Sequence, residues 1–203
     1  MKHKPIFITG IGTGVGKTIC SAILVENLQA DYWKPIQSGD LDSTDTEKVK
    51  SLVSNTKTVF HPEAYRLTQP YSPHKSALLD GISIELDKIV LPETDNRLLI
   101  EGAGGLMVPL NDHNLMIDLI QKFDAEVFLV SQNYLGSINH TLMSAEVLKS
   151  RNINLSTIIF CGNEDKSSEN IISRHLNVNI MHFPLFENLD KNVISEFAAQ
   201  LII

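Results

Sequence analysis

A glycine-rich segment near the start of the chain most restricts what it can fold into. Residues 10–18 read GIGTGVGKT, follow the apolar run Ile6 to Ile8, and lead into the helical-looking stretch Ile19 to Leu28. The order of strand, glycine-rich loop and helix is that of a phosphate-binding P-loop. Its glycines let backbone N–H groups surround an anion, and the helix N-terminus adds positive potential. The sequence therefore predicts a nucleoside triphosphate site directly after the first strand.

Two side chains of this loop carry the predicted phosphate chemistry. Lys17 would reach the outer phosphates, and the Thr18 hydroxyl could hold Mg²⁺. The usual spacing, G-x-x-x-x-G-K-[ST], requires glycine where this chain has Ile11; the loop glycines stand at positions 10, 12, 14 and 16. The alternative is a flexible turn with a chance GKT, which the strand-to-helix junction disfavours. The segment is thus a P-loop of divergent sequence.

Length and composition are those of an ordinary globular protein. The chain has 203 residues, which suits one compact domain over residues 1–203, because folding at this size removes about 70% of the unfolded chain's surface from water. The net charge of -7 and the pI of about 5.4 argue against a nucleic-acid or anionic-membrane partner, since both call for clustered Lys and Arg. These values favour small-molecule chemistry.

The N-terminus and the cysteines bear on location. Met1 to Lys4 is basic, but glycines soon interrupt the apolar run that follows, so neither a signal peptide nor a membrane span fits. We therefore expect a cytoplasmic protein. Cys20 and Cys161 are far apart in sequence and have no C-x-x-C or His-rich partner, which favours buried free thiols over a metal site.

Hydrophobic patterning predicts an α/β fold: a single-domain, three-layer P-loop NTPase fold with a mostly parallel sheet and helices on both faces. Strands are expected at Ile6 to Thr9, Tyr32 to Pro35, Leu98 to Glu101, Val127 to Ser131, Thr157 to Cys161 and Asn179 to Phe183. Helices are expected at Lys17 to Leu28, Thr44 to Ser54, Asn114 to Phe123, Ile138 to Ser150, Ser168 to Leu176 and Asp190 to Leu201. The proline-bearing region Asn55 to Leu91 predicts loops with one or two short helices.

Polar residues follow several predicted strands, at the edge where open parallel sheets bind ligands. Lys34 and Ser38 come after the second strand, although a surface lysine is the alternative there. Glu101 ends an apolar run before several glycines, and a carboxylate in that position is costly to bury unless it meets a cation such as nucleotide-bound Mg²⁺. Asp45 could supply a second carboxylate or be a helix N-terminal acid. Asn163 could read a purine edge or make a turn.

These motifs resemble those of dethiobiotin synthetases, enzymes of the biotin pathway in the P-loop NTPase superfamily. The resemblance runs nearly end to end and rests on GIGTGVGKT, KPIQSG at Lys34 to Gly39, SPH at Ser72 to His74, EGAGG at Glu101 to Gly105, LGSINH at Leu135 to His140, Gly162-Asn163 and Phe183-Pro184. KPxxSG combined with EGAGG distinguishes the family from the septum- and plasmid-positioning ATPases that share its fold.

The resemblance implies an ATP-dependent ring closure in which 7,8-diaminononanoate and CO₂ give dethiobiotin, ADP and phosphate. An amine captures CO₂ as a carbamate, the carbamate attacks the γ-phosphate, and the second amine displaces phosphate from the mixed anhydride. This mechanism needs no covalent enzyme intermediate, which agrees with the absence of an evident nucleophile and base pair in the sequence.

The resemblance also assigns roles to residues. The implied catalytic residues are Lys34, Lys17 and Thr13. The implied ATP-binding residues are Gly14, Val15, Gly16, Lys17, Thr18, Ile19, Asp45, Glu101, Gly102, Ala103, Gly104, Asn163, Pro184, Leu185 and Phe186. The implied Mg²⁺ ligands are Thr18, Asp45 and Glu101, and the implied substrate contacts are Ser38, Lys34, Gly136, Ser137 and Asn139.

A homodimer with the substrate site at its interface is a further implication. The helix that opens near Gly136 would receive the carboxylate tail of substrate bound in the partner subunit, because free amides at a helix start attract an anion. Plain N-capping by Ser137 is the alternative. His74, in the SPH motif, either lines the substrate cleft or shapes a turn.

Gly12 and Gly14 depart from the family, whose members often have acidic side chains at these positions. A loop with these glycines should be more flexible when no ligand is bound. The sequence therefore predicts nucleotide binding more firmly than it predicts which nucleotide is preferred. Three other functions are open: a regulatory NTPase switch, an amidotransferase-type ATPase acting on a cobalamin precursor, and an inactive binding module. Regulatory switches carry a lysine where this chain has Gly12, which argues against that function. Lys34, Thr18 and Glu101 are all present, which argues against an inactive module, so the synthetase function is preferred.

Overall fold

The centre of the molecule is a parallel sheet of seven strands. The computed structural model describes residues 3–202, in which these strands lie in the order β4-β2-β6-β1-β7-β8-β9. Every pairing between neighbours in the sheet is parallel. The bounds are β1 Ile6–Gly10, β2 Asp31–Trp33, β4 Phe60–His61, β6 Leu98–Gly105, β7 Glu126–Ser131, β8 Leu155–Cys161 and β9 Asn179–Phe183. This sheet confirms the parallel arrangement predicted from the alternating apolar runs.

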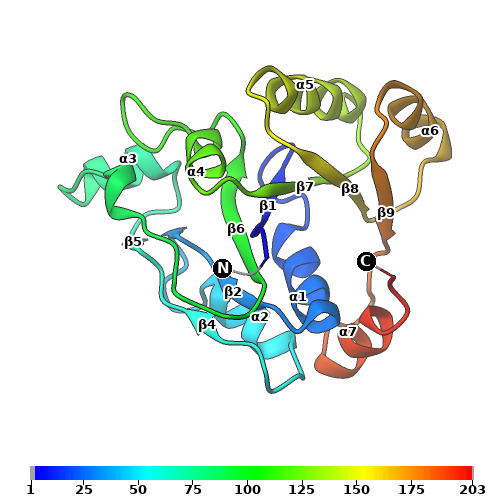
Figure 1. The fold of residues 1–203 in the computed structure, drawn as a ribbon, viewed down its shortest axis with the longest axis horizontal. Coiled ribbons are helices and arrows are strands. Elements are labelled where there is room, and N and C mark those ends of the chain that lie inside the picture. Colours follow the sequence, from blue (N-terminus) through cyan, green and yellow to red (C-terminus); the bar gives the residue numbers. More distant parts are fainter. Residues whose placement is uncertain (1–2, 203) are drawn as a thin grey trace.

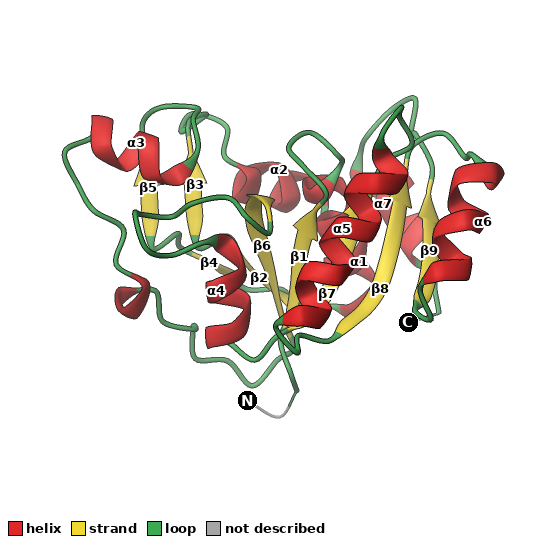
Figure 2. Ribbon diagram, turned by 90° about the horizontal axis from the view of Figure 1, so that it is seen from above, coloured by secondary structure: helices red, strands yellow, loops and turns green. Residues whose placement is uncertain are grey.

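Helices cover both faces of the sheet. In Figure 1 one group of helices lies below the sheet and another above it, and Figure 2 shows the second group in front of the strands. The lower helices are α1 Lys17–Leu28, α2 Asp45–Leu52 and α7 Lys191–Ala198; the upper ones are α4 Met116–Lys122, α5 Ser137–Ser150 and α6 Lys166–His175. The three-layer α/β fold class is thereby confirmed.

The central strands are buried on both faces, which explains their continuous apolar sequence. In β1 the side chains of Ile6 and Ile8 pack on the α1 side, whereas Phe7 packs in the separate cluster on the α4 side; all three are fully buried. Successive side chains of a strand point to opposite faces, so a strand between two helical layers has no solvent-facing residues. The apolar runs at 98–100 and 127–130 follow the same rule.

Capping residues set several helix starts. Thr44 and Asp190 were predicted as first helical residues, but each is the N-cap of its helix and accepts hydrogen bonds from first-turn amides. Thr44 also forms a capping box with Glu47. Asp165 caps α6 in the same way, so that helix begins two residues before the predicted Ser168. Side-chain oxygens at these positions satisfy amides that have no partner within the helix.

The region between residues 55 and 91 contains more strand than predicted. It contributes β4 to the edge of the main sheet and β5 Tyr65–Leu67, which pairs in parallel with β3 Ile36–Ser38 as a separate small sheet. Strands of two or three residues are too short to show a period of two, so the prediction missed these two strands, although most of the region is loop as expected. The expected short helices are present as α3 Pro73–Leu79 and the 3₁₀ turn η1 Leu86–Lys88.

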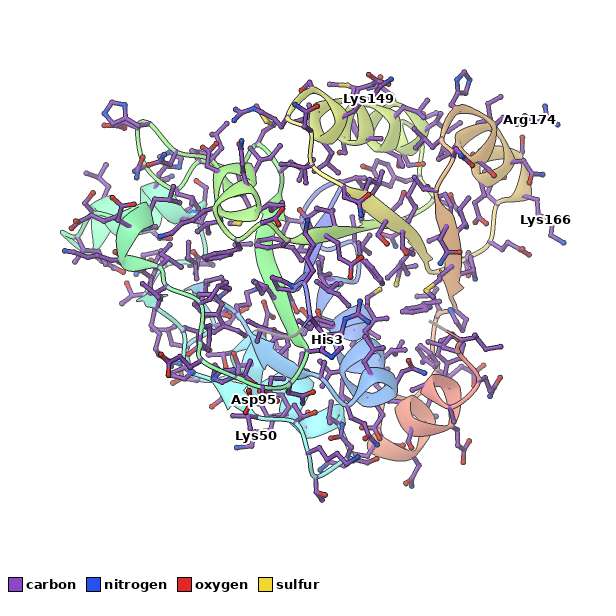
Figure 3. All side chains as sticks on the ribbon, in the orientation of Figure 1. His3, Lys50, Asp95, Lys149, Lys166 and Arg174 are labelled. Atoms are coloured by element: carbon purple, nitrogen blue, oxygen red, sulfur yellow. The ribbon has the colours of Figure 1, made fainter. Side chains whose placement is uncertain are left out.

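The outer face of the upper helices carries charge. Lys149 of α5 and Lys166 and Arg174 of α6 project away from the sheet (Figure 3). The inner faces of the same helices contribute buried residues such as Leu148 and Ile172. Across the described part of the chain, no helix has the length and apolar character needed to span a membrane.

Candidate nucleotide and metal site

The P-loop lies where the strand order reverses. β1 has β6 on one side and β7 on the other; α1 leads from β1 to β2, and α4 leads from β6 to β7 in the opposite direction across the sheet. Ligands of open α/β sheets bind outside the carboxyl ends of the strands at such a point. The fold thus brings together the P-loop after β1, Lys34 after β2 and Glu101 within β6.

The loop backbone is closely packed at one glycine and open at two others. Gly16 has a φ of 96°, and a Cβ at this position would lie 2.5 Å from the Cys161 sulfur. Only glycine satisfies both conditions without strain. Gly14 also has a positive φ, 75°, but a Cβ there would meet nothing within 4 Å, and the same space surrounds Gly12. The loop therefore presses against the end of β8 and leaves its tip open.

Lys17 curls back over its own loop. It is the first residue of α1, its side chain is largely buried, and its ammonium donates to the Gly12 carbonyl at 2.9 Å. Burial lowers the pKa of Lys17, and the nearby carboxylate of Glu101 opposes that shift. An anion at the loop would offer this ammonium a charged acceptor in place of a neutral carbonyl.

Lys34 is held between two carboxylates. Its ammonium lies 2.5 Å from Asp45 Oδ2 and 3.1 Å from Glu101 Oε1, and its side chain is 5% exposed. Burial alone would lower the pKa of Lys34, but the carboxylates of Glu101 and Asp45 together raise it above its usual value. The same ion pair outweighs burial at Asp45 and lowers the pKa of that carboxyl. The lysine is thus a fixed cation within the site and not a surface residue.

Glu101 is the centre of a buried hydrogen-bond network. The Thr18 hydroxyl donates to Oε1 at 3.0 Å, and the Tyr32 hydroxyl donates to Oε2 at 3.0 Å. Burial raises the pKa of Tyr32 well above its usual range, and the negative charges of Glu101 and Asp45 add to the shift. The phenol is therefore a hydrogen-bond donor to the carboxylate.

The donor set fits Mg²⁺. Thr18 contacts Glu101, and Asp45 and Glu101 both pair with the ammonium of Lys34, which occupies the space between the two carboxylates as a cation. Within residues 3–202 no group of three or more His, Cys, Asp or Glu side chains is arranged to hold a metal. A hydroxyl and two carboxylates suit a cation that binds through few protein oxygens and takes the rest of its shell from water and phosphate.

A cavity of about 560 Å³ joins these groups. The predicted residues on its wall are Thr13, Gly14, Gly16, Lys17, Thr18, Ile19, Lys34, Ser38, Asp45, Glu101, Ala103 and Gly104. The Ser38 hydroxyl is buried and has no hydrogen-bond partner among the described residues, which leaves it available to a ligand. Val15 is buried beneath the loop, and Gly102 packs on Phe7, where a Cβ would come within 2.7 Å of the ring.

The sequence reasoning missed several residues of this wall. Gln37, within KPIQSG, accepts a hydrogen bond from the Asp45 amide at 3.2 Å and donates to the Gly39 carbonyl at 2.9 Å, so it fixes the start of α2. Asp40, Pro70, Tyr71 and Val108 also line the cavity and were missed. Ser72 and Pro73 of the SPH motif line it as well, which agrees with one of the two predicted alternatives for that motif. Gln37 could have been found from its place in KPIQSG, whereas the other four lie in irregular segments or carry no chemical signature.

The residues predicted to face the base lie outside the cavity wall. Asn163 is exposed, and its carbonyl accepts from Asn133 at 2.9 Å. Leu185 is 64% exposed and lies beside Gly162. Phe186 packs edge-on against Phe197 of α7, with ring centroids 5.3 Å apart, and Pro184 is exposed. These residues do cluster at the carboxyl ends of β8 and β9, but they form an open surface.

The start of α5 is also separate from the cavity of the same chain. Gly136 is the N-cap, with a φ of 105°, and no side chain caps the first-turn amides. Ser137 is buried and accepts from the Tyr134 amide at 3.3 Å, so it braces the preceding turn and does not cap the helix. Asn139 is exposed. His74 is the second residue of α3, forms a hydrogen bond with Ser72 at 3.1 Å, and lies outside the cavity wall.

The two cysteines, distant in sequence, are neighbours in the fold. Both are free; Cys20 is buried in α1 and Cys161 is half-buried at the end of β8. Burial raises the pKa of the Cys20 thiol, and its hydrogen bond lowers the pKa of Cys161. Both thiols pack beneath the P-loop as part of the core on the α1 face.

The fold is shared with solved structures of other ATPases. A ParA family ATPase from Chlorobium tepidum superposes with a TM-score of 0.60 at 13% identity, covering 98% of this chain and 100% of that one. The cell division ATPase MinD from Pyrococcus furiosus gives 0.59 at 12% identity, covering 97% and 98%. At such low identity the likeness shows the fold alone.

Sequence comparison is more specific. The family model described as "AAA domain" matches residues 4–191. The ATP-dependent dethiobiotin synthetase of Cytophaga hutchinsonii is 49% identical over 98% of this chain and 97% of its own length, and that of Christiangramia forsetii is 52% identical over 96% and 94%. This likeness extends over nearly the whole chain and agrees with the geometry of the P-loop and the buried lysines described above. The chain therefore belongs to the dethiobiotin synthetase family.

Proposed function

We propose that this protein closes the ureido ring of dethiobiotin from 7,8-diaminononanoate, CO₂ and ATP, with release of ADP and phosphate. One observation carries the proposal beyond family membership: a buried lysine, Lys34, stands in the same cavity as the P-loop lysine, Lys17. The ammonium of Lys17 suits the phosphates of the nucleotide, and that of Lys34 suits the carbamate that attacks the γ-phosphate. Phosphoryl transfer depends mostly on such positioning and charge stabilisation.

The proposed reaction proceeds in three steps. An amine of the substrate attacks CO₂ and loses a proton to give a carbamate. A carbamate oxygen then attacks the γ-phosphorus, the bond to the β-γ bridging oxygen breaks, and ADP leaves. The second amine finally attacks the carbamate carbon, and inorganic phosphate departs with the oxygen that carried it. No enzyme nucleophile is required at any step.

Each side chain of the cavity has a proposed role in these steps. Lys17 and the loop amides hold the β- and γ-phosphates, while Lys34 lies between carbamate and γ-phosphate as negative charge moves from one to the other. Thr13 lines the cavity at the tip of the loop, and the unpartnered hydroxyl of Ser38 is placed to contact the amines or the carbamate. Gly14, Gly16 and Ile19 complete the nucleotide side of the wall.

Thr18, Asp45 and Glu101 would hold Mg²⁺. When bound there, the ion would neutralise charge on the phosphate oxygens. Lys34 now fills the space between the two carboxylates, so it would leave them as it turns toward carbamate and phosphate. The exchange keeps the buried carboxylates paired with a cation in both states, which avoids the cost of isolated buried charge.

The base is proposed to lie at the ends of β8 and β9. Asn163 would read the adenine edge, and Pro184, Leu185 and Phe186 would face the ring. The exposed apolar surface of Leu185 beside Gly162 supports this placement, because an aromatic base needs an apolar contact and close backbone. A cytoplasmic site of action is supported by the two free cysteines, since reducing compartments keep thiols reduced.

The active form is proposed to be a homodimer that shares its substrate site. Met107, Tyr134, Leu135 and Met143 are large apolar residues exposed by 44% or more. Two of them, Met107 and Met143, line a cavity of about 290 Å³ that also reaches Gly12 and Thr13 of the P-loop. The uncapped amides of α5 lie nearby in sequence and suit a carboxylate. A second copy would cover the apolar residues and supply those amides to its partner's substrate.

One assay tests the reaction directly. The purified protein is incubated with ATP, Mg²⁺, bicarbonate and 7,8-diaminononanoate, and mass spectrometry follows dethiobiotin. We expect product whose formation depends on all of these components and matches ADP release. ATP hydrolysis that does not depend on the diamine would contradict the proposal and favour the alternative of a regulatory NTPase switch.

Light scattering with an activity measurement tests the shared site. Wild type should show the mass of a dimer at high concentration, and Met143→Lys should shift it toward the monomer and lower turnover. Val90→Lys is the matched control, because Val90 is 68% exposed and lies outside this surface. A concentration-independent monomer that is fully active would refute the dimer.

A further inference from the structure

Tyr32 differs from the other groups of the site because it does not line the cavity. It is fully buried in β2, two residues before Lys34, and its ring lies 5.9 Å from that of Phe60. Its hydroxyl nevertheless reaches the carboxylate of Glu101 at 3.0 Å. A buried phenol hydroxyl costs free energy unless it has a hydrogen-bond partner, whereas phenylalanine would fill nearly the same volume without that requirement.

The sheet register explains why this contact forms. Tyr32 is opposite Leu99 in the parallel pairing of β2 with β6, and Glu101 lies two residues further along β6. Residues two apart on a strand share a face, so Glu101 lies on the same side of the sheet as Leu99. Tyr32 and Leu99 both belong to the core on that side. The phenol therefore extends along the sheet face to the carboxylate at its carboxyl end.

The two oxygens of Glu101 have partners of different kinds. Oε1 accepts from Thr18 at 3.0 Å and from Lys34 at 3.1 Å. These are the two groups proposed above to turn to other partners when Mg²⁺, nucleotide and substrate bind. Oε2 accepts from Tyr32, whose backbone is fixed in the sheet and whose ring is packed in the core. The bond to Oε2 can persist when both bonds to Oε1 are lost.

We propose that Tyr32 is a positioning residue of the metal site: its hydroxyl holds Oε2 of Glu101 so that Oε1 faces nucleotide-bound Mg²⁺. This rests on the proposed function of the site. An outer hydrogen bond of this kind orients a carboxylate ligand and reduces the entropy that the ligand loses on binding the ion. Tyr32 itself touches neither the ion nor the substrate.

Tyr32→Phe tests the role because it removes only the hydroxyl. Calorimetric titration of Mg²⁺ into the protein saturated with ADP should show affinity reduced by roughly 10-fold or more. Nucleotide affinity without Mg²⁺ should be unchanged. In turnover, the Mg²⁺ concentration for half-maximal rate should rise by a similar factor, and kcat at saturating Mg²⁺ should change little.

Tyr65→Phe is the matched control. Its hydroxyl also has a hydrogen bond, from the Glu85 amide at 3.0 Å, but it lies in the small sheet away from the carboxylates. This variant should leave the Mg²⁺ affinity unchanged. Tyr32→Met, which fills the core with a flexible apolar chain, is a second variant for the case in which Tyr32→Phe folds poorly. It also lacks the hydroxyl and should show the same loss of Mg²⁺ affinity.

A double-mutant cycle separates positioning from a structural role. In a Glu101→Gln background, Tyr32→Phe should cause no further loss of Mg²⁺ affinity, because the carboxylate on which it acts is gone. Unchanged Mg²⁺ affinity in Tyr32→Phe, or equal loss in both backgrounds, would overturn the proposal. Binding of Mg²⁺ with ADP needs no ring closure, so failure of the synthetase assay in wild type is a separate result.

Discussion

Two parts of the site are built differently: the phosphate end, around Lys17, Lys34 and Glu101, and the base end, around Asn163 and Leu185. At the phosphate end Lys17, Lys34 and Glu101 are buried; Lys34 pairs with Glu101, and Lys17 donates to the Gly12 carbonyl. At the base end Asn163 and Leu185 are exposed and lie outside the cavity. The residues proposed to stabilise charge already line one cavity, while the surface proposed for the base is open. The residues proposed to stabilise charge and those proposed to select the base thus form separate parts of the site.

Lys34→Ala should have the largest effect. It removes the cation proposed to bridge carbamate and phosphate, so turnover should fall roughly 100-fold or more, as for other preorganised charge contacts. Nucleotide affinity, measured by calorimetry with ADP, should remain near that of wild type. The control is Lys48→Ala, which removes an ammonium 3.6 Å from Asp45 but 44% exposed, and it should change turnover little. Intact turnover in Lys34→Ala would break the proposed division between the two lysines.

Lys17→Ala should act on binding itself. Loss of a charged hydrogen-bond donor to the phosphates should weaken ADP or ATP binding by about 10- to 100-fold. Calorimetry or equilibrium dialysis measures the affinity directly. An equal loss of nucleotide affinity in Lys34→Ala would show that the two lysines share one task.

Gly16→Ala should weaken nucleotide binding through the backbone. The added methyl would lie 2.5 Å from the Cys161 sulfur at a φ of 96°, so the loop or the end of β8 must shift. We expect affinity to fall about tenfold, with Gly14→Ala as control because its φ is also positive but its surroundings are open. The two affinities are compared by calorimetry. A greater loss in Gly14→Ala would contradict the packing explanation.

Asn163→Ala should have the smallest effect. An exposed amide contributes about 1 kcal/mol or less to binding, so ATP affinity should fall only a few-fold while the preference for ATP over GTP narrows. Competition between the two nucleotides measures the ratio, with the exposed Asn177→Ala as control. Collapse of all nucleotide binding in Asn163→Ala would show that the base end is as essential as the phosphate end.

The buried elements were predictable because their sequence repeats a physical pattern. α1 and β9 have the predicted bounds, and the motifs after β1, β2 and β6 named most of the cavity wall. β3 and β5 were missed because three residues cannot show a period. Tyr32 was missed for another reason: it reads as an ordinary strand residue, and its partner Glu101 is 69 residues away. Only the register of two strands reveals that contact.

The contact between Gly39 and Pro70 links distant parts of the cavity wall. Gly39 has a φ of 71°, donates to the Leu67 carbonyl at 2.8 Å, and has no room for a Cβ beside Pro70, whose Cα would lie 2.7 Å away. The segment from Pro70 to Pro73 is thereby fastened to the turn that follows Ser38 and forms the outer wall. Changes in that segment would reshape the space for substrate and leave the phosphate-binding groups in place, so this wall is where related enzymes can diverge in what they accept.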